Sequence, residues 1–145
     1  MYFVDRQKIE QILVFLEQQI KSFESDPVWE GTRAELALQR IVQVSIDSVL
    51  DTGNALIDGF IMRDPGSYED ILDILQDEKV ITEGTAIQFK EMLPLRKMLI
   101  QDYLSTSHNE IADGFTRNLE AFKQYPNAVR EYLGNELGPV SAFKN

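Results

Sequence analysis

The chain has 145 residues and a formal net charge of −10, with 14 lysines and arginines against 24 aspartates and glutamates. This acidic balance opposes non-specific binding to nucleic acid, whose affinity comes largely from neutralised phosphates, so RNA binding would need a local basic cluster. The absence of cysteine excludes disulfides and thiolate metal sites, and no apolar run reaches the length of a membrane span.

The first predicted helix covers Arg6–Glu24. Asp5 is its predicted N-cap, because a short side-chain oxygen at that position can accept a hydrogen bond from the first helical turn. The cluster Ser25–Asp26–Pro27 ends the helix, since proline disfavours helical geometry in the residue before it. One face carries an apolar stripe at helical spacing, formed by Ile9, Ile12, Leu13, Leu16, Ile20 and Phe23.

A second, long helix is predicted from Arg33 to about Phe60. Thr32 and Glu35 have the spacing of a capping box at its start, and Gly53 in its middle permits close packing of another helix. Apolar residues lie on more than one side of this helix, which requires more than one neighbour and predicts a subunit interface. Those outside the main face are Leu36, Val44, Ile46, Leu50 and Ile57.

Shorter helices are predicted in the middle of the chain. Ser67 caps a helix over Tyr68–Asp77, and Thr82 caps the next one. Pro94 has no amide hydrogen to continue that helix. We therefore expect a new segment over Pro94–Gln101, with the proline in its first turn.

The last long helix is predicted to start after a capping box formed by Ser107 and Glu110. Tyr125–Asn127 contains a proline and should break or bend the helix, which resumes over Ala128–Leu137. A short tail over 138–145 follows. Residues Ile111, Phe115, Leu119 and Phe122 form the apolar face of this helix.

No alternating strand pattern and no internal repeat interrupts these helices. The chain is therefore predicted to form a single all-α domain over 1–145, an antiparallel bundle of about five to six helices. Its N-terminus becomes polar at once and does not resemble a signal peptide. We expect a cytoplasmic protein with no membrane partner.

Arg96 is the most informative single residue, because it lies in the middle of an apolar helical face. A guanidinium stays charged, so it needs either an anionic partner or an open cleft. Together with Lys97 beside it and Lys90 a turn and a half earlier, Arg96 could hold a phosphate. The alternative is an ion pair with Asp47 or Asp51 on the long second helix. The other members of the face are Phe89, Met92, Leu93, Leu99, Ile100 and Tyr103.

Other ionisable residues are weaker candidates for a metal-binding or catalytic role. Asp47, Asp51 and Asp58 recur at helical spacing, and they form either a site for a hard cation or a solvated acidic face. His108, the sole histidine, is either a catalytic base, if the preceding turn folds back onto Arg96, or an exposed residue after a helix cap. No set of residues has metal-ligand spacing, so we expect neither a metal nor another cofactor.

The segment Arg96–Tyr103 resembles the signature of the HepT-like proteins of the HEPN superfamily, which is arginine, four to six residues, histidine, any residue, tyrosine. Arg96 and Tyr103 match it, Gln101 stands where the histidine belongs, and Lys97 replaces the asparagine that often follows the arginine. The resemblance includes Ala37–Arg40, Leu50–Asn54 and Gly66–Leu72. Asp51 and Asn54 in the second of these stretches are further candidate site residues.

The resemblance implies an all-helical homodimer in which the two motifs face a shared cleft. It also implies a metal-independent ribonuclease toxin, held in check by an MntA-like nucleotidyltransferase that adds AMP to the motif tyrosine. In that scheme Arg96 steadies the scissile phosphate, the motif histidine moves protons, and Tyr103 is the regulatory target.

Gln101 departs from the motif in a way that affects the chemistry. An amide donates and accepts hydrogen bonds but cannot exchange a proton near neutral pH, and general acid–base catalysis contributes about 10²–10⁴ in rate. Three interpretations remain open. The protein is a nucleotide- or RNA-binding or regulatory homodimer with a degenerate nuclease site, an active ribonuclease in which His108 has taken over proton transfer, or a purely structural dimer with Arg96 ion-paired.

Overall fold

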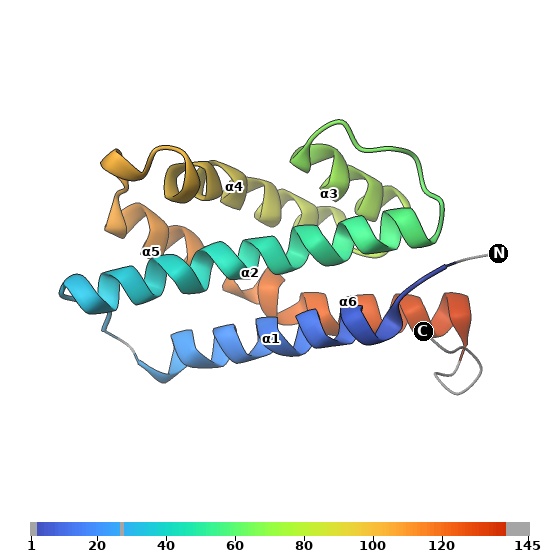
Figure 1. The fold of residues 1–145 in the computed structure, drawn as a ribbon, viewed down its shortest axis with the longest axis horizontal. Coiled ribbons are helices and arrows are strands. Elements are labelled where there is room, and N and C mark those ends of the chain that lie inside the picture. The colour runs from blue at the N-terminus through green and yellow to red at the C-terminus, as the bar shows by residue number, and fades with distance from the viewer. Residues whose placement is uncertain (1–2, 27, 139–145) are drawn as a thin grey trace.

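The computed structural model describes residues 3–26 and 28–138, and every regular element in these ranges is a helix (Figure 1). This confirms the predicted all-α class. Pro27 and the predicted tail from residue 139 onward lie outside the described residues. The elements are α1 (Arg6–Ser25), α2 (Thr32–Gly59), α3 (Tyr68–Asp77), α4 (Glu83–Ile100), the short 3₁₀ helix η1 (Tyr103–Ser105), α5 (His108–Arg117) and α6 (Leu119–Leu137).

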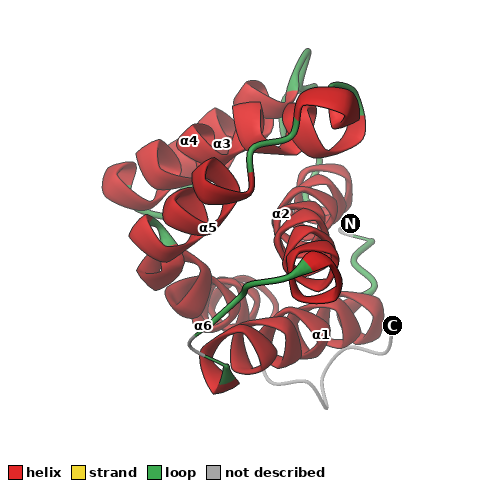
Figure 2. Ribbon diagram, turned by 90° about the vertical axis from the view of Figure 1, so that its left-hand side faces the viewer, coloured by secondary structure: helices red, strands yellow, loops and turns green. Residues whose placement is uncertain are grey.

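Helix α2, the longest with 28 residues, lies between α1 and the pair α3 and α4 (Figure 1). It packs against α3, α4 and α5 on one side and against α1 on the other, where α1 also contacts α6. Figure 2 looks along the helices and shows them arranged around the core. None of the described helices combines the length and the hydropathy that crossing a bilayer requires.

The several apolar sides of α2 are covered within one chain. Ile46, Leu50 and Ile57, which led us to expect a subunit interface, are buried in the core of this chain. The sequence argument for a second copy is therefore wrong for these residues, because α1, α3, α4 and α5 supply the neighbours they need. Leu36, near the start of α2, remains exposed.

Gly53 lies where α2 and α3 approach each other closely. A Cβ atom at this position would be 2.9 Å from Cγ2 of Ile71 and 3.0 Å from Cδ1 of Leu75. Both contacts are closer than apolar carbon atoms normally approach. The glycine therefore permits the close helix packing that its position in the middle of a helix suggested.

Local capping signals locate most of the helix starts. The second helix is the exception, because its N-cap is Gly31 at φ 93°, with no capping side chain, and Thr32 is already helical. The capping box predicted for Thr32 and Glu35 is therefore wrong. Four other predicted N-caps are confirmed, each accepting a backbone hydrogen bond from the residue three positions later: Asp5, Ser67, Thr82 and Ser107.

Both internal prolines lie within continuous helices. Pro94 is inside α4 and Pro126 is inside α6, so the breaks predicted at these residues are wrong. A proline removes one backbone hydrogen-bond donor from the helix. The neighbouring side chains Met92 and Tyr125 are fully buried, and their packing stabilises the helix on both sides of the missing bond.

The break in the last long segment occurs instead at Asn118, between α5 and α6. The Asn118 Nδ2 group donates to the carbonyl oxygen of Gly114 at 3.0 Å and to Oε2 of Glu91 at 3.1 Å. Asparagine side chains that bond to nearby backbone compete with the regular helical pattern. Asn118 is buried, so these contacts fix the corner where α6 turns away from α5.

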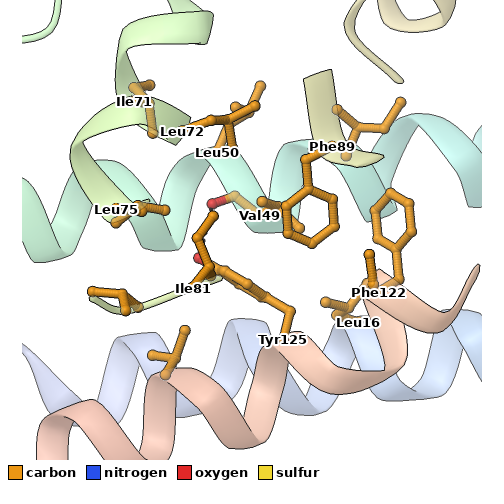
Figure 3. Packing of buried hydrophobic residues seen from close by; sticks show 14 of the residues in the cluster. Leu16, Val49, Leu50, Ile71, Leu72, Leu75, Ile81, Phe89, Phe122 and Tyr125 are labelled. Carbon is orange, nitrogen blue, oxygen red and sulfur yellow. Dashed lines mark hydrogen bonds between the residues drawn. The ribbon is translucent and has the colours of Figure 1, made fainter. Parts of the chain in front are cut away.

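Tyr125 connects α6 to α2 in the centre of the core (Figure 3). Its ring is fully buried and meets Phe89 edge-on, with centroids 5.5 Å apart. Its hydroxyl lies 2.6 Å from Oγ1 of Thr52 and donates to the carbonyl oxygen of Val49 at 3.1 Å. Burial raises the pKa of Tyr125, so the phenol stays protonated.

We expect Tyr125→Phe to lower the free energy of unfolding by about 1–2 kcal/mol, because it removes a buried hydrogen bond and leaves the ring in place. Urea denaturation would measure the change. Tyr103→Phe is the matched control, since that hydroxyl is exposed, and its effect should stay within about 0.5 kcal/mol. Equal stability of the two variants would show that the buried bond contributes nothing.

Candidate functional site

Arg96 on α4 forms an ion pair with Asp47 on α2. Its Nε–H group donates to Oδ1 of Asp47 at 2.7 Å. The Arg96 side chain is 20% exposed and that of Asp47 is 29% exposed, so solvent reaches both partners. Of the alternatives left open for Arg96, the structure thus shows the ion pair, with Asp47 and not Asp51 as the partner, and the Arg96 side chain remains partly open to solvent.

Tyr68, the first residue of α3, provides the third side of this site. The Cζ atom of Arg96 lies 4.5 Å from the centroid of the Tyr68 ring, which is the geometry of a cation–π contact. The tyrosine is 48% exposed. Asp47, Arg96 and Tyr68, hereafter the Arg96 cluster, thus come from three different helices. Sequence reasoning did not assign Tyr68 to the site, although it lies in the resembling stretch Gly66–Leu72.

The surroundings keep the guanidinium charged. Partial burial acts to lower the pKa of Arg96, but the hydrogen bond that Arg96 donates to Asp47, the negative charge of Asp47 and smaller contributions from Tyr68 outweigh this, and the pKa lies above its ordinary value. Arginine has five N–H donors. Because the hydrogen bond to Asp47 uses Nε–H, donors on the Nη atoms remain for a second anion.

Asp51 and Asn54 follow Asp47 along α2, and both are exposed. Partial burial and the negative charge of Asp47 raise the pKa of Asp51, and the charge of Arg96 opposes the rise. Asp58, the last member of the acidic series, is also exposed. Over residues 3–26 and 28–138, no three histidine, aspartate or glutamate side chains lie close enough to hold a metal ion.

Gln101 and Tyr103, which follow α4, form no hydrogen bond or ring contact with Arg96 in the described part of the chain. The helix ends at Ile100, so Gln101 is its exposed C-cap and Tyr103 belongs to η1. The prediction that Tyr103 shares the helical face of Arg96 is therefore wrong. Tyr103 is 69% exposed, and in the described part of the chain neither residue has a hydrogen bond or ring contact with Arg96.

The basic residues near Arg96 do not converge on it. Lys97, its neighbour in sequence, is exposed on α4. Lys90, one and a half turns earlier, is ion-paired with Asp73 on α3. Of these three basic residues, Arg96 is the one that contacts Asp47 and Tyr68.

His108 begins α5 in different surroundings. It lines a surface pocket with Phe23 and Trp29, and none of the residues around that pocket belongs to the Arg96 cluster. Its Nδ1 atom is buried without a hydrogen-bond partner in the described residues. The structure therefore does not bring the histidine to Arg96.

Comparison with known proteins gives a consistent assignment. Residues 6–129 match the sequence profile of a family described as Ribonuclease HepT-like. The Bacillus subtilis (strain 168) protein named "Putative RNase YutE" is 51% identical over 144 residues, which is 99% of this chain and 100% of that protein. The solved structure of YutE, described there as a cytosolic protein, has a TM-score of 0.95 over 99% of this chain and 100% of that one.

Two more distant solved structures share the fold. One is a toxin–antitoxin structure with AMP-PNP, at 18% identity and a TM-score of 0.68, covering 83% of this chain and 96% of that one. The other is the tri-AMPylated HEPN toxin of Shewanella oneidensis in complex with MNT antitoxin, at 17% identity and a TM-score of 0.72, covering 86% and 95%.

The raised pKa of Asp51 predicts a pH-dependent effect on stability. A folded-state pKa above the ordinary value of 3.8 means that ionisation opposes folding, so this contribution to stability is lost as the pH rises through the two values. We expect Asp51→Asn to raise the free energy of unfolding at about pH 7. Near pH 3 the carboxyl is protonated in both states, and the difference should shrink.

Urea denaturation at the two pH values would measure this effect. Asp58→Asn, on the same helix, is the matched control. A loss of stability in Asp51→Asn at neutral pH would contradict the prediction, because it would show that attraction to Arg96 outweighs burial and the repulsion from Asp47.

Proposed function

Because this chain belongs to the Ribonuclease HepT-like family, we propose that it is a nucleotide- or RNA-binding member with weak or no ribonuclease activity. The observation that carries this proposal is the Arg96 cluster. A permanent cation is held in a fixed orientation by Asp47 and Tyr68, and it is still reached by solvent.

In this proposal Arg96 binds a phosphate through its Nη groups while Asp47 holds Nε. Hydrogen bonds from a guanidinium to phosphate are charge-assisted and stronger than neutral ones. Asp47 already neutralises part of the positive charge, so it weakens the attraction of the phosphate but does not occupy the Nη groups. Exposed Lys97 contributes further positive charge at the same end of α4.

The weak nuclease activity follows from Gln101. The amide cannot take a proton from a ribose 2′-hydroxyl near neutral pH, and the loss of general acid–base catalysis removes about 10²–10⁴ in rate. In this proposal Gln101 occupies the place of the motif histidine that transfers protons. Tyr103 is the tyrosine that a nucleotidyltransferase would modify. The net charge of −10 also disfavours long RNA.

A second candidate function is an active ribonuclease toxin controlled by an antitoxin. It is favoured by the name given to the Bacillus relative and by the exposure of Tyr103, which leaves its hydroxyl accessible to a nucleotidyltransferase. In that case AMP from ATP would be attached to the tyrosine oxygen, with release of pyrophosphate. A cytoplasmic location suits both candidates, since YutE is described as cytosolic.

RNA cleavage separates the two candidates. We expect Gln101→His to cleave RNA at least about 10²-fold faster than the unmodified chain, because it restores a group that titrates near neutral pH. Adding Arg96→Ala to this variant should abolish the gain. Gel analysis of a labelled RNA without added metal would measure the rates.

Arg117→Ala is the matched control, because it removes the same charge from an exposed ion pair on α5. Cleavage by the unmodified chain that is lost in both Arg96→Ala and His108→Ala would instead support the active enzyme. Unmodified chain that already cleaves as fast as Gln101→His would contradict the proposed degenerate site.

We also propose that the protein is a homodimer whose motifs face a shared cleft, as the family resemblance implies. Ile100, Tyr103 and Leu104 form a group of exposed apolar residues at the end of α4, of which Leu104 is 94% exposed, and grouped exposed apolar residues mark interaction surfaces. Leu104→Asp should therefore convert the dimer to a monomer, as measured by light scattering.

Ile61→Asp is the control, at an exposed apolar residue that follows the far end of α2, opposite the α4–α5 connection (Figure 1). It should leave the dimer intact. A monomeric unmodified chain would contradict the proposed assembly.

A further inference from the structure

We propose that Tyr68 is a stacking surface for a nucleobase, so that the Arg96 cluster binds a small nucleotide with its base on Tyr68 and its phosphate on Arg96. This inference rests on the proposed binding of phosphate by Arg96. It adds a substrate class, nucleoside monophosphates, and a residue that determines specificity.

The position of Tyr68 is fixed by the start of α3. Ser67, the N-cap, accepts a hydrogen bond from the backbone N–H of Asp70 at 3.1 Å. Oδ2 of Asp70 in turn accepts one from the backbone N–H of Gly66 at 2.7 Å. These two bonds hold the backbone on both sides of the tyrosine, so the ring is attached to a rigid turn.

The two faces of the Tyr68 ring have different surroundings. The guanidinium of Arg96 lies over one face, 4.5 Å from the ring centroid. The residue as a whole is 48% exposed, so solvent reaches part of this tyrosine on its fixed backbone. Bases stack readily on such aromatic side chains, with little dependence on sequence.

The spacing suits one nucleotide. A base stacked on the outer face would lie about 3.5–4 Å beyond the ring, on the side away from Arg96. The phosphate of the same nucleotide would then reach past the ring edge to the Nη groups, which Asp47 leaves free when it binds Nε.

The charges around Tyr68 favour a small ligand over a long one. Glu69, Asp70 and Asp73 follow it on α3, and among residues 3–26 and 28–138 only Asp73 of these three has an ion-pair partner, Lys90. A polynucleotide would bring many phosphates against these carboxylates, whereas a mononucleotide brings one to Arg96. The site therefore fits a nucleoside monophosphate better than an RNA strand.

Isothermal titration calorimetry with AMP and with ribose 5-phosphate tests the inference, because the second ligand has the same phosphate ester and no base. We expect the unmodified chain to bind AMP about 5- to 100-fold more tightly. Tyr68→Leu should remove this preference and leave the affinity for ribose 5-phosphate nearly unchanged. Tyr68→Phe should keep the preference, since stacking needs the ring and not the hydroxyl.

Arg96→Ala should lose both ligands, and Phe15→Leu, at an exposed aromatic residue on α1, should lose neither. Equal affinity of the unmodified chain for the two ligands would overturn the stacking role and leave the phosphate site standing. An equal loss of both ligands in Tyr68→Leu would also overturn it, because the ring would then act only by orienting Arg96. Failure of both ligands to bind the unmodified chain would remove the proposed function as well.

Discussion

The ion pair between Arg96 and Asp47 is the interaction on which the account of this protein depends. It joins α4 to α2 through a 2.7 Å hydrogen bond at the edge of the core. A pair this open to solvent adds only about 0–1 kcal/mol to stability. Its main consequence is orientation, because Asp47 binds one edge of the guanidinium and the Tyr68 ring lies against it. A cation held in this way is ready to bind an anion without a further loss of side-chain freedom.

Much of the fold could be predicted from local sequence. Asp5, Ser67, Thr82 and Ser107 cap helices through hydrogen bonds within one turn, and short-range patterns reveal such bonds. The errors came from long-range packing. Pro94 and Pro126 break no helix, because burial of their neighbours outweighs one missing donor, whereas Asn118 makes a corner through contacts with Glu91 on another helix.

The site could also be predicted only in part, because local sequence patterns do not show which distant residues meet. A cation on an apolar stripe needs an anionic partner or an open cleft, so residue type and helical spacing singled out Arg96 and offered Asp47 and Asp51 as partners, and the structure shows the pair with Asp47. Tyr68 could not be found in this way, because its contact with Arg96 joins the start of α3 to the end of α4. The separation of Tyr103 from the face of Arg96 depends on where α4 ends, and a helix end is poorly defined by periodicity alone.

A crystal structure of the protein with bound AMP tests the central claim most directly. We expect a phosphate oxygen within hydrogen-bonding distance of the Nη atoms of Arg96, with Nε still bonded to Asp47 and the adenine ring parallel to Tyr68. A structure in which AMP is absent from this site, while Arg96 keeps only its carboxylate partner, would contradict it and leave the ion pair as a purely structural contact between two helices.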